Sequence, residues 1–142
     1  DPPPFTHQRA SWTPFTRIME GEVNYPGESK ALADYAQKHP EFAYYVEPLL
    51  GKVMNAELLR SYMQDALNFQ QRTTSPLYCG EFGVIEHAPA ISRQNWLHDL
   101  VALLNEHRIG RAIWSYKQMN YGMVDANSKV VEPEFVKLAC QR

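Results

Sequence analysis

The chain has 142 residues, of which 44% are hydrophobic and 12% aromatic, and its formal net charge is −2. This length fits one average domain, and the apolar content is sufficient for a packed core. The lack of a basic surplus argues against nucleic acid as a partner. No apolar run approaches the roughly 18 residues of a membrane-crossing helix, so we expect no membrane span. Two cysteines are too few for a disulfide framework.

The first 54 residues are expected to form a long loop followed by short helices. Residues 1–27 are rich in proline and aromatic side chains and show no sustained helical or strand period, which indicates an ordered loop. Short helices are expected at 29–38, where Pro40 would stop the helix, and at about 41–50. Because the sequence opens with "DPPP" and no methionine, we expect a processed or truncated chain.

The remainder, residues 55–142, is expected to alternate helices with strands. Apolar periodicity places helix, strand, helix, strand and helix at 55–72, 77–83, 92–107, 109–115 and about 132–141. Asn55 and Ser92 are the expected N-caps of the two long helices, and Ile91 is expected to pack on Trp96 as a hydrophobic staple. This order predicts an α/β fold with parallel strands. Two parallel strands do not make a stable sheet alone, so the chain is expected to belong to a larger sheet.

The candidate functional residues lie at the ends of the two strands, because functional residues of parallel α/β sheets concentrate at the carboxyl ends of the strands. Glu81 lies in "YCGEFGV", an apolar run that indicates a buried strand, and Trp114 lies at the end of the second strand. A carboxylate beside an exposed tryptophan is typical of sugar sites, in which the ring stacks on a pyranose and the acid acts at the anomeric carbon. From the residues alone, a capped or ion-paired Glu81 and a core Trp114 are the alternative.

Three stretches, "LYCGEFGV", "NWLHDLVALLNEHRIGRAIWSY" and "YGMVD", resemble in order and spacing the last third of glycoside hydrolase family 5, the cellulase family. The stretches "DPPPFTHQRASW" and "VNYPG" resemble the loop after the sixth barrel strand of bacterial members. The resemblance implies an α/β fold that is the C-terminal portion of a (β/α)₈ TIM barrel, about strands 7 and 8 with flanking helices and the long loop after strand 6. Residues 1–142 would then be a partial catalytic domain, divided into 1–54 and 55–142 as above.

The resemblance also implies roles for particular residues. Glu81 corresponds to the nucleophile, and Trp114 to the stacking platform of a sugar subsite, with a cis peptide bond after it. Tyr116 and Lys117 lie just past the strand end, where they could reach sugar hydroxyls, although a solvated lysine is an equal alternative. Asp125 matches a hairpin aspartate with a structural role.

Two further expectations concern the first loop and the second strand. His7 and Gln8 would border the positive subsites, either as sugar contacts or through hydrogen bonds that order the loop. Arg111 departs from the family pattern, and by strand alternation it should face the outer helices rather than the site.

The function implied is that of a retaining β-glycosidase acting on β-glucan, of the endoglucanase or cellulase type, with no metal or cofactor. Its acid/base residue would lie in the N-terminal part of the barrel, so that part is required and the isolated chain is expected to be inactive. A mannanase, a β-1,3-glucanase and a non-catalytic carbohydrate-binding fragment are the alternatives. The partner would be a β-linked oligo- or polysaccharide, which implies a secreted or periplasmic protein because a polymer does not enter a cell.

Overall fold

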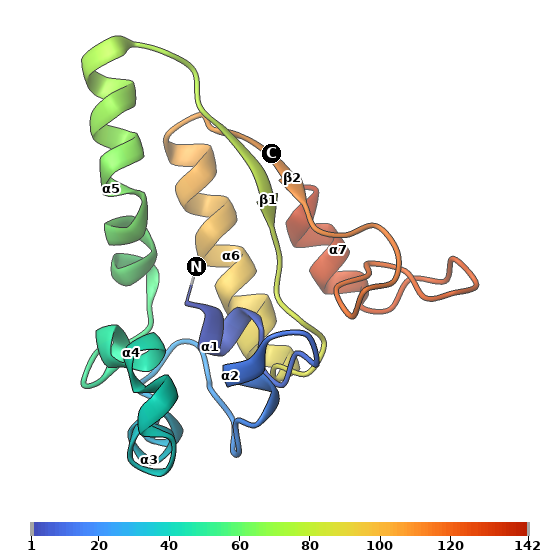
Figure 1. Ribbon diagram of the computed structural model, residues 1–142. Coiled ribbons are helices and arrows are strands. Elements are labelled where there is room, and N and C mark those ends of the chain that lie inside the picture. Colours follow the sequence, from blue (N-terminus) through green and yellow to red (C-terminus); the bar gives the residue numbers. More distant parts are fainter. Residues whose placement is uncertain (1, 142) are drawn as a thin grey trace.

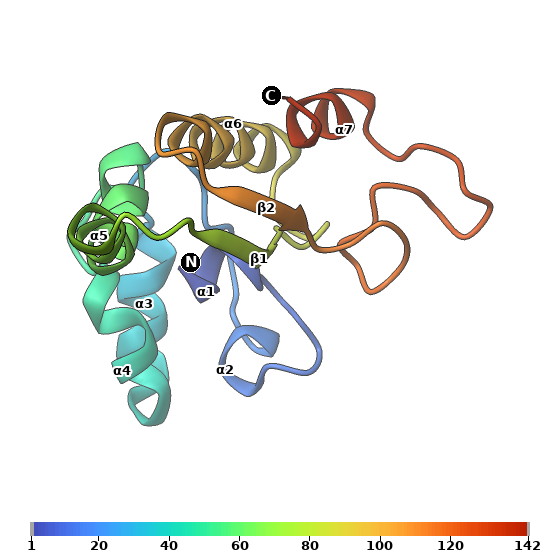
Figure 2. The same cartoon turned by 90° about the horizontal axis from the view of Figure 1, so that it is seen from above.

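A computed structural model describes residues 2–141 as a small parallel sheet backed by helices, with loops and short helices at one end of the strands (Figure 1). The elements in chain order are α1 (Pro3–Thr6), α2 (Pro14–Arg17), α3 (Lys30–Lys38), the 3₁₀ turn η1 (Pro40–Phe42), α4 (Ala43–Val46), the 3₁₀ turn η2 (Glu47–Leu49), α5 (Ala56–Thr73), β1 (Tyr78–Phe82), α6 (Ala90–Glu106), β2 (Gly110–Ile113) and α7 (Pro133–Ala139). Seen from above, α6 and α7 lie on one side of the strands and α1 and α2 on the other (Figure 2). No helix within residues 2–141 is long and apolar enough to cross a membrane.

The segment before α5 differs from the sequence prediction in two places: it contains short helices within residues 1–27, and three short turns where one helix was expected. The expected loop 1–27 contains the single-turn helices α1 and α2, each with a proline in its first positions, where the missing N–H is not needed. The helix expected at 29–38 is confirmed as α3. The helix expected at about 41–50 is instead three consecutive turns, η1, α4 and η2, because prolines interrupt the regular hydrogen bonding.

The first long helix agrees with its expected bounds to within one residue and has the expected cap. The Asn55 side-chain oxygen accepts a hydrogen bond from the Leu58 backbone N–H at 3.0 Å, which satisfies one of the free donors at the start of α5. The apolar stripe is buried at Leu59 and Leu67, whereas Tyr62 is exposed. The helix therefore buries some of its periodic apolar side chains and leaves others exposed.

The second long helix begins two residues earlier than predicted. Pro89 is the N-cap residue of α6, so Ser92 falls within the first turn, where its hydroxyl donates to the Asn24 side chain at 3.4 Å. The Ser92 cap is therefore wrong. The hydrophobic staple is wrong as well, because Ile91 is 65% exposed while Trp96 is fully buried. The apolar periodicity that predicted this helix agrees with its burial, since the structure buries Leu97, Leu100, Val101 and Leu104.

The two strands pair in parallel through the crossover helix α6, as predicted. Tyr78 pairs with Gly110 and Phe82 with Ile113, with an irregular register between Cys79 and Phe82. The expectation of a buried strand is wrong for most of β1. Phe82 is buried and packs on Trp96 at a ring-centroid distance of 6.4 Å, whereas Tyr78 is 67% exposed. Within β1 the structure thus buries Phe82 and leaves Tyr78, Gly80 and Glu81 exposed.

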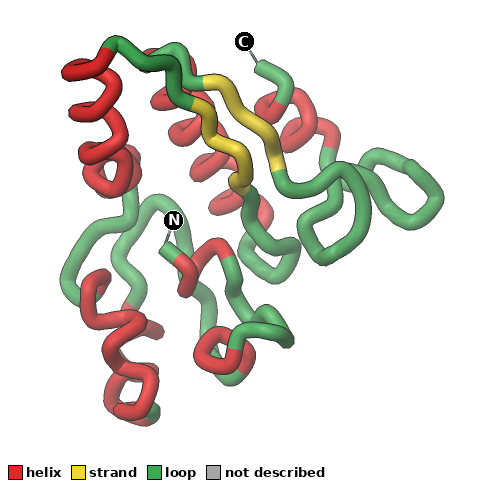
Figure 3. Tube along the Cα trace, turned by 45° about the horizontal axis from the view of Figure 1, so that its top comes forward, coloured by secondary structure: helices red, strands yellow, loops and turns green. Residues whose placement is uncertain are grey.

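The N-terminal loop is fixed to α6 by aromatic packing. Phe5 lies with its ring centroid 5.8 Å from that of Tyr25 and 6.5 Å from that of Trp96, and all three side chains are buried. The Tyr25 hydroxyl donates to the Asp99 carboxylate of α6 at 2.8 Å. These contacts hold the first loop at the same end of the molecule as the segments that leave β1 and β2 (Figure 3).

Candidate active site

Glu81 and Trp114 lie at the same end of adjacent parallel strands. Glu81 is the second-last residue of β1, and Trp114 directly follows β2. The Trp114 backbone N–H donates to the Phe82 carbonyl oxygen at 2.7 Å. Both side chains line one hollow of about 240 Å³. The full lining is His7, Trp12, Glu81, Phe82, Gly83, Trp114, Met119 and Tyr121. Glu81 is exposed and Trp114 is 42% exposed, so both side chains are accessible to a ligand in this hollow.

Gly83 allows the two strand ends to come this close. A Cβ atom placed on Gly83 would lie 2.2 Å from the Trp114 carbonyl oxygen and 3.1 Å from the Tyr121 ring. No side chain fits there, so this glycine is required for close backbone approach rather than for an unusual backbone angle. The peptide bond between Trp114 and Ser115 is cis, which confirms what the resemblance implied.

His7 borders the hollow from the first loop. Its Nδ1 atom and the Thr6 hydroxyl share a hydrogen bond of 2.9 Å, and its ring meets the edge of Tyr121 at a centroid distance of 5.9 Å. Burial lowers the pKa of His7 below its ordinary value, and the negative charge of Glu81 opposes this by raising it. The imidazole near Glu81 is therefore neutral at neutral pH and has both a donor and an acceptor nitrogen.

Gln8 does not reach the hollow, which corrects the expectation of a sugar contact there. Its side chain is fully buried. Its amide nitrogen donates to the Val23 carbonyl oxygen at 2.7 Å, and its amide oxygen accepts from the Val23 N–H at 3.0 Å. Both polar atoms thus order the loop, in agreement with the alternative role considered for this residue.

Tyr116 and Lys117 also lie outside the lining of the hollow, in the long segment between β2 and α7. Tyr116 is 63% exposed, and the Lys117 ammonium donates to the Ser128 hydroxyl at 3.1 Å. The structure does not place either side chain toward Glu81. In the same segment, one Asp125 carboxylate oxygen accepts from two backbone N–H groups, at 2.8 and 2.9 Å, which fits its expected structural role.

Arg111 is oriented as strand alternation predicted. Its guanidinium donates to the Asn105 side chain at 2.6 Å and to the Gln141 carbonyl oxygen. The first contact is at the end of α6, so the side chain points to the helical layer and away from the hollow. In the described part of the chain, no group of three His, Cys, Asp or Glu side chains is arranged to hold a metal ion.

The lining residues that come from loops far from Glu81 were not identified from the sequence, with the exception of His7; they are Trp12, Met119 and Tyr121. The Tyr121 hydroxyl donates to the Thr6 carbonyl oxygen at 2.9 Å and so connects the segment after β2 to the first loop. Burial raises the pKa of Tyr121, and the charge of Glu81 adds to this. Trp12 lies 6.3 Å from Tyr121 between ring centroids and is 52% exposed. These residues lie in loops, where no periodic pattern indicates which way a side chain points.

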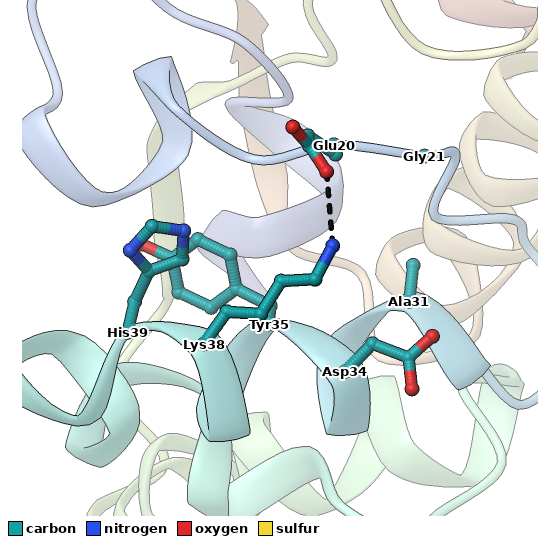
Figure 4. Close-up of a pocket in the computed structure, with 7 residues that line it drawn as sticks. All are labelled: Glu20, Gly21, Ala31, Asp34, Tyr35, Lys38 and His39. Atoms are coloured by element: carbon teal, nitrogen blue, oxygen red, sulfur yellow. Dashed lines mark hydrogen bonds and ion pairs between the residues drawn. The ribbon is translucent and has the colours of Figure 1, made fainter.

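A second hollow, of about 200 Å³, lies between α3 and the loop at Glu20 and Gly21 (Figure 4). The Lys38 ammonium reaches across it to the Glu20 carboxylate at 3.1 Å, and both side chains are exposed. Such an exposed pair contributes little to stability. None of the residues predicted for the site lines this hollow.

The burial of His7 and its charge interaction with Glu81 predict a pH-dependent behaviour of the full-length protein. The proton of His7 should be lost at a pH below the ordinary value of 6.5, and Glu81→Gln should lower the pKa of His7 further, because the charge that raises it is removed. NMR titration of the imidazole, assigned with His7→Gln, measures both values.

The sign of the associated stability change follows from linkage. The unfolded chain binds a proton at His7 as the pH falls through 6.5, whereas the folded chain does so at a lower pH. The free energy of unfolding should therefore decrease below pH 6.5, and His7→Gln should remove this part of the decrease. A His7 that titrates above 6.5 in the folded protein would contradict the burial that the structure shows.

The parallel pair, the crossover helix and the hollow at the carboxyl ends of the strands are features of a (β/α)₈ barrel. The chain superimposes on Thermotoga maritima Cel5A, solved in complex with a mannotriose substrate, with a TM-score of 0.68 and 19% identity, covering 98% of this chain and 36% of that one. Another solved glycoside hydrolase gives a TM-score of 0.69 at 22% identity over 98% of this chain and 38% of its own. The chain is thus part of a (β/α)₈ barrel.

Sequence relatives point to one family with this fold. Endoglucanase C of Acetivibrio thermocellus and endoglucanase C307 of Clostridium sp. (strain F1) are each 36% identical to the chain over 138 residues, or 97% of it. The chain spans about 40% of the length of these relatives. No protein-family model matches it. The similarity to these endoglucanases and to the solved barrels confirms the resemblance to the C-terminal part of glycoside hydrolase family 5.

Proposed function

We propose that this chain is the nucleophile-bearing part of a retaining β-glucanase of the endoglucanase type. The observation that carries the proposal is the presence of Glu81 and Trp114 in one hollow, at the carboxyl ends of adjacent parallel strands. The similarity to endoglucanases over nearly the whole chain supports it. The test is hydrolysis of carboxymethyl cellulose by the full-length protein, with NMR of the product to establish retention at the anomeric carbon.

The reaction would divide between this chain and the part of the barrel that precedes it. Trp114 stacks on a pyranose ring, and the Glu81 carboxylate attacks the anomeric carbon to form a glycosyl-enzyme. The neutral His7 imidazole offers a hydrogen bond to a sugar hydroxyl. A retaining enzyme needs a second carboxyl group about 5–5.5 Å from the first. Among the described residues that line the hollow, Glu81 is the one acid, so the acid/base residue belongs to the preceding part.

The choice of polymer is a separate part of the proposal. We favour β-1,4-glucan because of the endoglucanase relatives. Mannan is the second candidate, since the similar Thermotoga maritima Cel5A was solved with mannotriose. Comparison of kcat/KM on cello-oligosaccharides, manno-oligosaccharides and a β-1,3-glucan decides between them. Binding to one of these without any hydrolysis would favour a non-catalytic carbohydrate-binding role.

The isolated 142-residue chain should hydrolyse none of these polymers at a useful rate. It would lack the acid/base carboxyl group, and general acid–base catalysis alone contributes about 10²- to 10⁴-fold. The measurement is release of reducing sugar by the purified chain, with the full-length protein assayed at equal concentration as the control. Activity of the isolated chain close to that of the full-length protein would show that the division of the site is wrong.

We further propose that the full-length protein acts outside the cytoplasm, because its polymeric substrate does not enter the cell. Fractionation of producing cells, with the enzyme followed by an antibody against this chain, tests this. Detection of the protein only in the cytoplasmic fraction would contradict it.

A further inference from the structure

We propose that Met119 is a substrate-contacting residue whose side chain forms an apolar wall of a sugar subsite next to Trp114. This inference rests on the proposed function and adds to it a residue that determines affinity. Three features support it: an unusual turn between β2 and α7, the contacts that hold this turn, and the exposure of the Met119 side chain.

The turn has three consecutive residues in the left-handed region. The φ angles of Gln118, Met119 and Asn120 are +67°, +62° and +62°. Asparagine adopts this conformation with relative ease, whereas glutamine and methionine rarely do. Residues in sparsely populated backbone conformations persist where the surrounding structure fixes them, and they concentrate at functional sites.

The contacts around the turn show what fixes it. The Asn120 carbonyl oxygen accepts from the Glu86 N–H at 2.8 Å, and the Asn120 side chain is hydrogen-bonded to the His87 ring at 3.2 Å. On the other side, the Ser115 hydroxyl donates to the Gln118 carbonyl oxygen at 3.2 Å. The turn is thus anchored to the loop that follows Glu81 and to the residue that follows Trp114.

None of these anchors involves the Met119 side chain. It is 60% exposed, so burial of this side chain does not explain its unfavourable backbone conformation. It nevertheless lines the hollow together with Glu81, Trp12 and Trp114. The Met119 side chain is therefore exposed in the hollow and is available to contact a ligand.

The chemistry of the side chain indicates what it contacts. A thioether is apolar, polarisable and adaptable in shape, and it offers at most a weak acceptor. It therefore suits the C–H surface of a pyranose ring and not a hydroxyl group. Since it is not placed to transfer a proton or to attack carbon, its contribution should be to binding, and it should affect KM more than kcat.

The test compares three variants of the full-length protein with cellotetraose as the probe. Met119→Asn removes the apolar side chain while keeping a residue suited to the left-handed conformation, so KM should rise about 5- to 20-fold with kcat within about twofold. Met119→Leu should recover most of the lost affinity, because it restores an apolar surface. Gln118→Asn is the matched control, since it changes a neighbouring left-handed residue whose side chain does not line the hollow.

The thermal unfolding midpoint separates binding from folding. Met119→Asn should leave it unchanged or raise it, because the turn itself is not weakened. An unchanged KM in Met119→Asn would overturn the inference. Equal losses of affinity in Met119→Asn and Gln118→Asn would also overturn it, since the turn and not the side chain would then be responsible. An unmutated protein that neither binds nor hydrolyses β-glycans would instead refute the proposed function, and this inference with it.

Discussion

Replacement of Glu81 by Gln in the full-length protein should abolish hydrolysis of β-glucan, with a loss in kcat of about 10⁴- to 10⁶-fold. The amide is close to the acid in shape, so it preserves packing at the strand end but does not act as a carboxylate nucleophile. The loss should appear in kcat, because the substitution leaves Trp114 and the rest of the hollow in place to bind sugar, as the proposed function requires. Release of reducing sugar over a long incubation measures it.

Glu86→Gln is the matched control for this substitution. Glu86 is exposed, lies five residues further along the same segment, and does not line the hollow. Its replacement should leave kcat near the unmutated value. A 2-fluoro sugar that traps the glycosyl-enzyme should label the full-length protein at Glu81. Labelling at Glu86, or full activity of Glu81→Gln, would show that the nucleophile was assigned to the wrong carboxylate.

The elements of the second half were predictable because each has a strong local signal. Asn55 caps α5 as its residue type suggests, and the apolar stripe of α6 is buried where periodicity placed it. The start of α6 was not predictable from Ser92 alone, because Pro89 begins the helix earlier. Exposure of most of β1 was also missed, since an apolar run indicates a strand but not how much of it the chain itself covers.

The candidate site also contains residues that were predictable from the sequence and residues that were not. Glu81 and Trp114 were predictable because strand ends of a parallel pair must meet at one edge of the sheet, whatever the loops do. Gln8 was predicted as a possible sugar contact, but its amide instead binds the backbone of Val23, fifteen residues away. Tyr121 was missed although its stretch had been noticed, because its hydroxyl bonds to Thr6, 115 residues away. Such contacts between distant loops leave no local pattern in the sequence.

The second large effect should come from Gly83→Ala. The new methyl group would meet the Trp114 carbonyl oxygen, which is backbone and does not rotate away. Either the strand ends separate, which weakens the 2.7 Å hydrogen bond from the Trp114 N–H to Phe82, or the tryptophan is displaced. Overpacking of this kind costs about 1–3 kcal/mol in the free energy of unfolding. Denaturant unfolding of the full-length protein measures this cost.

The loss of activity in Gly83→Ala should exceed what its stability alone explains. A displacement of about 1 Å in a positioned group can reduce the rate about 10²-fold, and this glycine allows the close approach between the strand of the proposed nucleophile and the tryptophan. The matched control is Gly80→Ala in the same strand. A Cβ on Gly80 would approach nothing closer than the Tyr78 ring at 3.8 Å, so this variant should retain stability and turnover. If Gly83→Ala folds and turns over substrate as well as Gly80→Ala does, the close approach of the two strand ends is not needed for catalysis.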